Sequence, residues 1–330
     1  MTGRGLQADT NGDGSESQAG GRALDLLTVP LVGRILQRLS DGPKRLVELQ
    51  VQTGPAPQTT LRTHVRGLEE IGAVIKRGRE ESPGVIEFAL GEPGEDLLEV
   101  VAAIERWLQL MPEGPLSFDS DPGKAALKAL YGGWTSTILR ALAESPHSLS
   151  ELASTIRAVS YPAIERRLSA LRLSGLVEAQ EGNGRGTPYG VTDWLRQGVA
   201  PLAAAMHWEQ HHLPDDSAAM TRVDAETIFL LALPALRTPR SLSGSCLMGV
   251  RLNGDEDDLA AVVAHVRKGE VSCSPQNGDR TDAWAKGEPP AWIRAMVGLE
   301  RDHLDVGGKR RLARALVKGL GPDLLVVTGG

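Results

Sequence analysis

The sequence predicts a mainly α-helical protein with small β-hairpins, in which one helical unit occurs twice and an α+β domain follows. Three observations predict this fold. An apolar pattern that begins at Ile35 returns at Ile138, an offset of 103 residues (138 − 35). In both copies the third helical segment ends at a glycine that precedes two short apolar runs, as in a helix followed by a hairpin. Beyond residues 214–217, strand-like and helix-like patterns mix.

Composition and charge limit the function classes. With 330 residues, 41% of them apolar, the chain can form two or three domains that each bury a core. Residues 1–21 read as a disordered Gly/Ser/Asp-rich tail, and no apolar run is long enough to span a membrane, so we expect a cytoplasmic protein without membrane contact. The net charge of −6 argues against a general nucleic-acid coat. Sequence-specific DNA binding remains compatible with this net charge, because it needs only a local basic face. The charge of a phosphate is screened beyond about 10 Å at ordinary salt.

Each copy begins with three helical segments. The first covers residues 35–39 or 138–142 and ends at a proline-containing turn. The second begins in copy two with a capping box of Ser148 and Glu151. The third has apolar residues at i, i+4 and i+7 and ends at a glycine suited to a C-cap, Gly72 or Gly175.

A hairpin and a long helix complete each copy. Copy one has strands at 73–75 and 85–90 around a polar tip, and copy two has strands at 176–177 and 189–192. The closing helices, 94–109 and 194–211, each carry a tryptophan near the end, Trp107 or Trp208. Three helices and a hairpin form a winged helix-turn-helix. We therefore expect such domains at 22–109 and 131–213, joined by a linker at 110–130.

Both copies resemble the HxlR-type (MarR-like) winged helix-turn-helix regulators. The matching strings in copy one are ILQRLSDGPKRLVEL, TLRTHVRGLEEIGAVIKR and VIEFALGEPGEDLLEVVAAIERW, and in copy two WTSTILRALAESPHSLSEL, AIERRLSALRLSGLVEA and TPYGVT. Copy one departs from the pattern at Leu31, which stands where copy two has Trp134. Both copies lack the N-terminal cysteine of redox-sensing relatives, which argues against a thiol sensor. The resemblance implies a transcription regulator that binds double-stranded DNA.

The DNA-reading residues are expected on the outer face of each third helix and on each wing, because arginine can bind guanine and wing cations can bind phosphate. In copy one they are Thr59, Arg62, Thr63, Arg66, Lys76, Arg77 and Arg79, and in copy two Arg166, Ser169, Arg172 and Arg185. Their alternative interpretation is a set of solvated surface charges. Copy two has the weaker basic face, so a partly architectural role stays open for it. As a pair, the copies could imitate a symmetric dimer with recognition helices roughly 34 Å apart.

The C-terminal third is expected to be an α+β domain. The pattern predicts helices at 221–236 and 291–297 and strands at 245–252, 262–267, 271–274 and 282–286, before a last strand and helix. The string TDAWAKGEPPAWIRAMVGLERDHLDVGGKRRLARALVKGL makes residues 221–330 resemble the sterol carrier protein 2-like domain. That resemblance implies an apolar cavity for a small apolar ligand. Candidates for lining it are Phe229, Met248, Trp284, Trp292 and Met296, which could equally form the domain's core.

No catalytic motif is evident, so we expect neither an enzyme nor a cofactor. The two cysteines, Cys246 and Cys273, argue against a disulfide framework. His207 and His211 have i, i+4 spacing and could share a metal ion, but no third ligand is evident in the sequence, so no metal site is expected. The alternative function is a small-molecule or lipid carrier, or a protein-interaction protein, whose winged helices do not read DNA. The closing helices could also hold a homodimer together.

Overall fold

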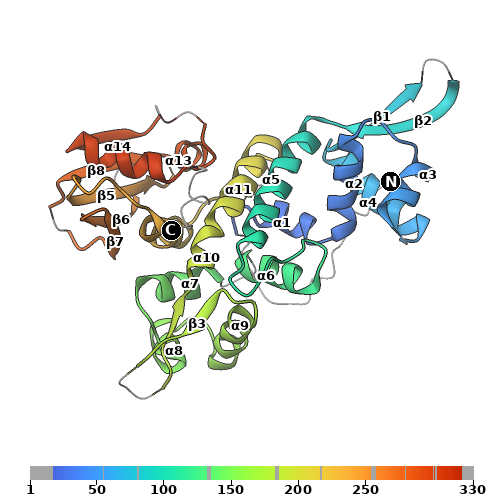
Figure 1. Ribbon diagram of the computed structural model, residues 1–330. Helices are drawn as coiled ribbons and strands as arrows, with labels where there is room; N and C mark the ends of the chain where they lie inside the picture. The colour runs from blue at the N-terminus through green and yellow to red at the C-terminus, as the bar shows by residue number, and fades with distance from the viewer. Residues whose placement is uncertain are drawn as a thin grey trace.

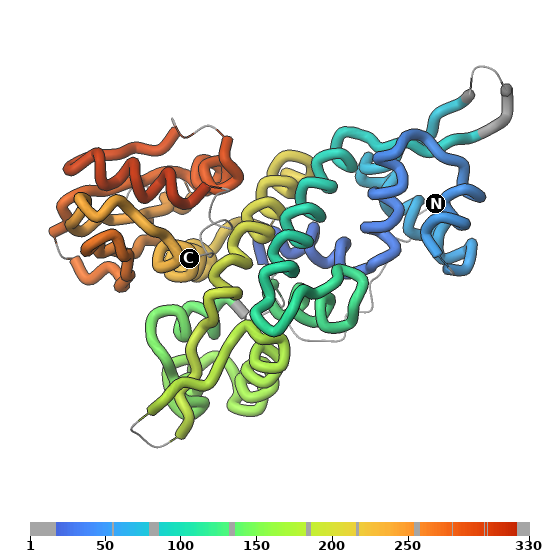
Figure 2. The backbone as a smooth tube through the Cα atoms, viewed as in Figure 1, coloured from blue at the N-terminus to red at the C-terminus, as the bar shows by residue number. Residues whose placement is uncertain are grey.

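The computed structural model describes residues 18–54, 56–79, 82–131, 135–182, 186–215, 218–253, 258–278, 280–299, 301 and 303–321. Three parts follow one another along the chain and lie side by side (Figures 1 and 2). The first two parts contain the repeated pattern, and the third is the α+β domain. Trp134 and Arg185 lie outside the described residues.

The first unit begins with a helix that the sequence analysis did not identify. Its elements are α1 (Gly21–Leu27), α2 (Pro30–Ser40), α3 (Leu46–Thr53), α4 (Gln58–Glu70), β1 (Val74–Arg79), β2 (Ser82–Leu90) and α5 (Glu92–Gln109). Residues 76–79 and 82–84, expected at the hairpin tip, instead extend its two strands. The sequence did not indicate this extension, because these residues are charged or polar residues, glycine or proline and show no apolar alternation.

The second unit repeats this order of helices and strands. Its elements are α6 (Asp121–Tyr131), α7 (Thr135–Glu144), α8 (Leu149–Thr155), α9 (Tyr161–Leu173), β3 (Val177–Ala179), β4 (Tyr189–Val191), α10 (Asp193–Gln197) and α11 (Val199–His212). Helix α6 covers much of the expected linker and packs on α1, where Tyr131 donates a hydrogen bond to Asp25 at 2.9 Å. The closing helix, expected to be continuous, is divided at Gly198, a residue of low helix propensity.

Matching local contacts appear in both units. Gly72 and Gly175 have φ angles of +71° and +70°, the left-handed conformation predicted for a glycine C-cap. A short bridge joins the turn after the first long helix to the second wing strand, at Lys44–Phe88 in one unit and at His147–Tyr189 in the other. Ser148 and Glu151 form the predicted capping box.

The two units meet along their closing helices, α5 and α11, which cross the middle of the molecule (Figure 1). The two helices are antiparallel. The indole of Trp208, near the end of α11, donates to the carbonyl of Pro93 at the start of α5 at 2.7 Å. The indole of Trp107, near the end of α5, donates to the carbonyl of Trp194 at 2.9 Å. Pro93, which accepts from Trp208, lies 14 positions before Trp107 (107 − 93). Trp194, which accepts from Trp107, lies 14 positions before Trp208 (208 − 194). The pairing is therefore close to two-fold symmetric.

The C-terminal part is a sheet with helices on one face. It contains α12 (Arg222–Ala235), β5 (Gly244–Arg251), β6 (Leu259–Arg267), β7 (Glu270–Pro275), β8 (Ala283–Gly287), α13 (Pro289–Met296), β9 (Asp305–Gly308) and α14 (Arg310–Gly319). The strand order is β7-β6-β5-β8-β9, with β5 and β8 parallel and the other neighbours antiparallel. Along β5, Cys246, Met248 and Val250 are buried beneath the helices, whereas the alternating positions point to the other face. This α+β order agrees with the expectation.

Two elements in this part begin more than one residue from their expected starts. Helix α13 begins at Pro289, because a proline is accommodated in the first turn of a helix. Strand β6 begins at Leu259, three residues earlier than expected. None of the described helices combines the length and the apolar character needed to cross a membrane.

Candidate nucleic-acid interface

Helix α4 divides cleanly into a buried and an exposed side. Leu61, Val65 and Leu68 are at most 2% exposed and anchor the helix in the first unit. The opposite side presents the four residues of the recognition stripe, spaced at i, i+3, i+4 and i+7: Thr59, Arg62, Thr63 and Arg66, all of them exposed. Among the residues that the structure describes, neither arginine of this stripe has an ion-pair partner. Both guanidinium groups are therefore available to an anionic or hydrogen-bonding partner.

The cations of the first wing differ in their availability. Lys76 forms an ion pair with Glu69 of α4, with 2.8 Å between Nζ and Oε1, and its side chain is still 57% exposed. Arg77 is exposed and lies opposite Glu87 in the ladder. Arg79 ends β1, but its side chain lies outside the described residues. Lys76 is thus partly neutralised within the protein, which the sequence analysis did not anticipate.

Helix α9 has a weaker cationic face than α4. Arg166 and Ser169 are exposed, but Glu165 is exposed beside them. Arg172 is not free, because its guanidinium lies over the Tyr189 ring at 4.9 Å from the centroid and so supports the second wing. Of the residues expected to read DNA in the second unit, Arg166 and Ser169 therefore remain on the outer face of the helix.

Two side chains near these surfaces were not singled out from the sequence. Tyr161, the first residue of α9, is 48% exposed, and Leu173 at the other end of α9 is 90% exposed. In the sequence, Tyr161 beside Pro162 indicates only the start of a helix. Its exposure follows only from the placement of α9 in the unit.

The expected ligand-lining residues of the C-terminal domain fall into two places. Phe229 of α12, Met248 of β5, and Trp292 and Met296 of α13 are all buried. The Phe229 and Trp292 rings meet edge to face at 4.9 Å, and the Trp292 indole donates to the carbonyl of Gly249 at 2.8 Å. Trp284 lies on the opposite face of the sheet and is 36% exposed. These contacts favour the core interpretation for the first four residues, and they separate Trp284 from that group.

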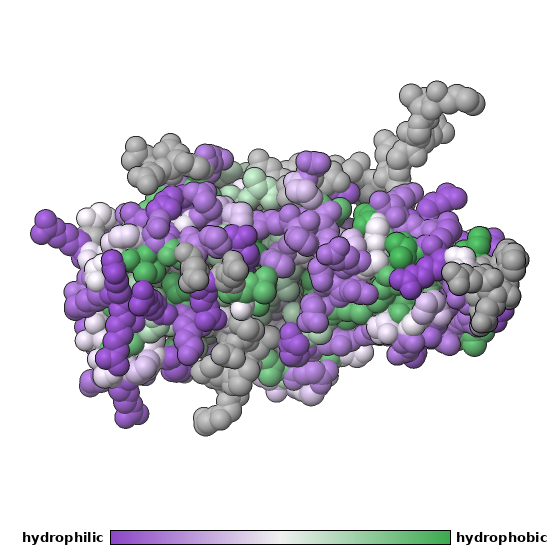
Figure 3. All heavy atoms as spheres, turned by 90° about the horizontal axis from the view of Figure 1, so that it is seen from above, coloured by the Kyte–Doolittle hydropathy of each residue, from purple (hydrophilic) through white to green (hydrophobic). Residues whose placement is uncertain are grey.

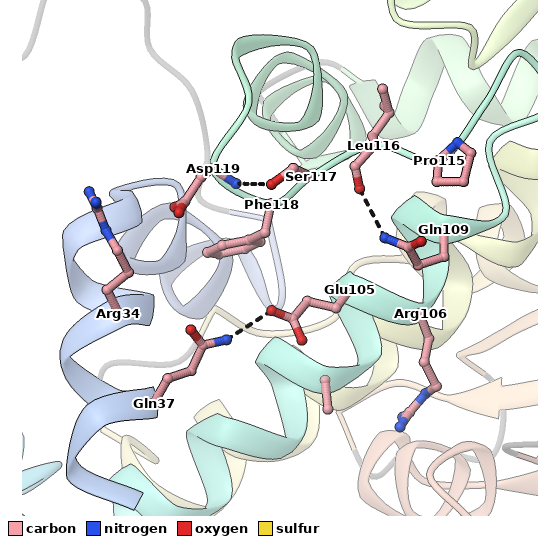
Figure 4. A pocket seen from close by; sticks show the side chains of 11 residues that line it. Arg34, Gln37, Glu105, Arg106, Gln109, Pro115, Leu116, Ser117, Phe118 and Asp119 are labelled. Carbon is pink, nitrogen blue, oxygen red and sulfur yellow. Dashed lines mark hydrogen bonds between the residues drawn. The ribbon is translucent and has the colours of Figure 1, made fainter. Parts of the chain in front are cut away.

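A cleft of about 590 Å³ lies elsewhere, in the first unit between α2, α5 and residues 115–119 (Figure 4). The Phe118 ring points into it, while Gln37 donates to Glu105 across it at 2.8 Å. Arg34, Arg106 and Asp119 also contribute to its lining. No sequence pattern indicated this cleft, because its residues come from three segments that only the fold brings together.

Polar chemistry at the other expected positions is limited. Cys246 and Cys273 are free thiols on strands separated by β6, and burial raises the pKa of each to about 12. Only a small fraction of either thiol is ionised to the thiolate at neutral pH, so neither cysteine is suited to reversible oxidation.

The rings of His207 and His211 stack with their centroids 6.3 Å apart. The fold places Asp96 of α5 close to His211 and His212. Hydrophilic residues cover most of the molecule as seen from above, with smaller apolar patches between them (Figure 3).

The comparisons with known proteins concern the first unit. Residues 31–113 match the model of the HxlR-like helix-turn-helix family. This segment runs from the start of α2 to just beyond α5 and includes the recognition stripe and the first wing. No curated protein matches the chain. The family match supports DNA binding and transcription regulation, and it points to a regulator rather than an enzyme.

Proposed function

We propose that this protein is a sequence-specific regulator of transcription that reads double-stranded DNA chiefly with helix α4. The observation that carries this proposal is the recognition stripe, which lies opposite the fully buried side of the same helix, within the segment that matches the family. A helix anchored on one side and polar on the other can enter the major groove without losing core contacts.

The stripe supplies suitable chemistry for base recognition. Arg62 and Arg66 can each form two hydrogen bonds with a guanine edge, and Thr59 and Thr63 can contact a base or a phosphate. Wing residues Lys76 and Arg77 would contact phosphate, which adds affinity and salt dependence but little sequence preference. The proposal therefore gives the helix the role of reading bases and the wing the role of fixing register.

We also propose that the second unit is a second winged helix-turn-helix domain and that one chain takes the place of a dimer. The support is the near two-fold pairing of α5 and α11 through Trp107 and Trp208. Because this pairing uses the closing helices within one chain, a homodimer would have to use other surfaces. Helix α9 contributes the weaker contacts, through Arg166 and Ser169, so the operator is expected to be asymmetric.

The test is binding of the purified full chain to fragmented genomic DNA from its host at two salt concentrations, with sequencing of the retained fragments. A regulator enriches a few discrete sites, and its affinity falls steeply as salt rises. The double variant Arg62→Ala, Arg66→Ala should lose these sites, whereas Arg38→Ala, an exposed arginine on α2, should retain them. Retention of the sites by the double variant would show that α4 does not read the operator, and absence of enriched sites for the unchanged protein at low salt would favour the carrier or protein-interaction function.

Control by a small apolar ligand in a sterol-carrier-like C-terminal domain is a second, separable proposal. Its support is the α+β order of this domain and its buried apolar cluster. A ligand there would have to displace the contact between Phe229 and Trp292, so binding should change the melting temperature. A panel of fatty acids and sterols that alters neither the melting temperature nor the DNA affinity would remove ligand control from the function.

A further inference from the structure

A cluster of potential metal ligands lies where α5 begins and α11 ends. Asp96 comes from α5, and His211 and His212 come from the last turn of α11. One ligand atom from each of the three residues lies within 4.8 Å of those of the other two. The cluster therefore joins the first unit to the second, at one end of the helix pair that holds the two units together.

The contacts within the cluster are already close. His212 Nε2 lies 2.8 Å from Asp96 Oδ2, and the His212 side chain is only 7% exposed. The His211 and His212 rings meet edge to face, with centroids 4.6 Å apart. Asp96 and His211 are exposed, so an ion can reach them and water can complete its coordination. Among the described residues, the ligand atoms that lie within 4.8 Å of one another come from Asp96, His211 and His212, so His207 stays outside the ligand set.

We propose that Asp96, His211 and His212 bind a divalent transition-metal ion of the zinc, cobalt or nickel class. Imidazole nitrogen and carboxylate oxygen are the ligands that these ions prefer when cysteine is absent. Metal–ligand bonds of about 2.0–2.1 Å place tetrahedral ligand atoms roughly 3.3 Å apart. His212 Nε2 and Asp96 Oδ2 would separate by about 0.5 Å to admit the ion, and the wider spacings would close by about 1.5 Å or less, which ordinary rotation about side-chain bonds permits.

The electrostatic setting is compatible with a cation. Carbonyl groups at the end of α11 carry partial negative charge, and the start of α5 carries partial positive charge, so the two helix ends largely offset each other. The Asp96 carboxylate then supplies the net attraction. One carboxylate and two imidazoles form the donor set, and water can complete the coordination.

The consequence of binding is mechanical. An ion held by Asp96 on one side and by two histidines on the other links α5 to α11 directly. It binds the folded arrangement and not the separated helices, so it should raise the melting temperature. It would also restrict movement between the unit that carries α4 and the unit that carries α9.

The experiment uses the full chain after removal of any histidine tag. Titration with Co²⁺ should produce ligand-field absorption, and Zn²⁺ should displace it and raise the melting temperature. Asp96→Asn, which preserves side-chain size, and His211→Ala should each weaken Co²⁺ binding by at least about tenfold, because even outer-shell changes cost that much. His265→Ala, an exposed histidine on β6, is the matched control and should bind as the unchanged protein does.

Two results would overturn the proposal. One is the absence of both Co²⁺ absorption and a Zn²⁺-dependent melting shift in the unchanged protein. The other is full retention of binding by Asp96→Asn and by His211→Ala. Both readouts are independent of DNA, so failure here would leave the proposed regulatory function standing, and loss of DNA binding would not affect the metal test.

Discussion

The indole rings of Trp107 and Trp194 stack with their centroids 4.7 Å apart and their planes within 10° of parallel. Each indole nitrogen donates to the backbone carbonyl of the other residue, and both hydrogen bonds measure 2.9 Å. Both side chains are at most 1% exposed. The two units are therefore joined by a pair of indole rings whose apolar faces stack and whose N–H groups are both hydrogen-bonded.

Trp107→Phe tests this contact. Phenylalanine preserves much of the stacking surface but has no N–H group, so the carbonyl of Trp194 loses its indole donor in a buried position. Leaving such a group unpaired costs about 1–3 kcal/mol. We expect a fall of that size in the free energy of unfolding, measured by urea denaturation.

Trp284→Phe is the control for that measurement. Trp284 is 36% exposed on the open face of the sheet. Its replacement should change the free energy of unfolding by about 0.5 kcal/mol or less, as at other surface sites. Equal effects from the two substitutions would contradict the importance of the paired indoles.

Glu209 gives a prediction about pH. It is 1% exposed and accepts hydrogen bonds from the backbone N–H groups of Gly20 at 2.9 Å and Ala23 at 2.7 Å, so it caps the start of α1. Burial nevertheless raises its pKa above the ordinary value of 4.5. The folded protein thus holds this proton more tightly than the unfolded chain. The stability contributed by the protonated group is complete below the unfolded pKa and is lost as pH rises through the folded one.

Glu209→Gln removes this titration while it retains one acceptor oxygen. The unfolding free energy of the unchanged protein, relative to this variant, should be greatest near pH 4 and should fall with rising pH until Glu209 is ionised. Urea denaturation of both proteins between about pH 4 and pH 8 provides the measurement. A difference that stays constant, or that grows with pH, would show that burial does not dominate at Glu209.

Local signals made much of the fold predictable. The capping box of Ser148 and Glu151, the left-handed Gly72 and Gly175, and the apolar spacing of α4 depend on neighbouring residues, and the structure has each of them. Helix α1 was missed because its cap is Glu209, 186 residues beyond Ala23. No local pattern can indicate such a partner.

The same reasoning explains what was missed in the candidate sites. His211 lacked a further ligand in the sequence because Asp96 reaches it only through the antiparallel pairing of α5 and α11. The wing cation Lys76 looked free, but the end of α4 brings Glu69 to it. Sequence patterns locate helix faces well, and they say little about which distant charges a face will meet.

Gly94 in α5 offers a prediction about packing. A Cβ atom at this position would lie 2.0 Å from the carbonyl oxygen of Ala73, so α5 can approach β1 only with glycine there. Gly94→Ala should therefore lower the free energy of unfolding by about 1–3 kcal/mol, the usual cost of overpacking. Thermal and urea denaturation measure the change.

Gly67 is the matched position for that prediction. It lies inside α4, and a Cβ atom there would have no neighbour within 4 Å. Gly67→Ala should stabilise the protein by about 0.5–1 kcal/mol through helix propensity alone. If Gly94→Ala were equally stabilising, the close approach of α5 to β1 would not be a constraint on the fold.

The unequal recognition helices give a prediction about DNA binding. Arg62 on α4 has no acidic neighbour in the recognition stripe, whereas Arg166 on α9 is adjacent to the exposed Glu165. Arg62→Ala should weaken operator binding about 5- to 150-fold, the range for losing a guanine contact, and should relax sequence preference at one base pair. Arg166→Ala should have a smaller effect, because the Glu165 carboxylate already opposes contact with DNA.

Arg77→Ala distinguishes base reading from phosphate contact. As a wing cation, Arg77 should contribute equally at every sequence, so its loss should weaken specific and non-specific DNA alike and lower the slope of log affinity against log salt by about one. Fluorescence anisotropy with an operator and an unrelated duplex, across a salt series, measures both quantities. If Arg62→Ala and Arg77→Ala behaved identically on the two duplexes, α4 would bind the DNA backbone rather than read its bases, because only a base contact can depend on sequence.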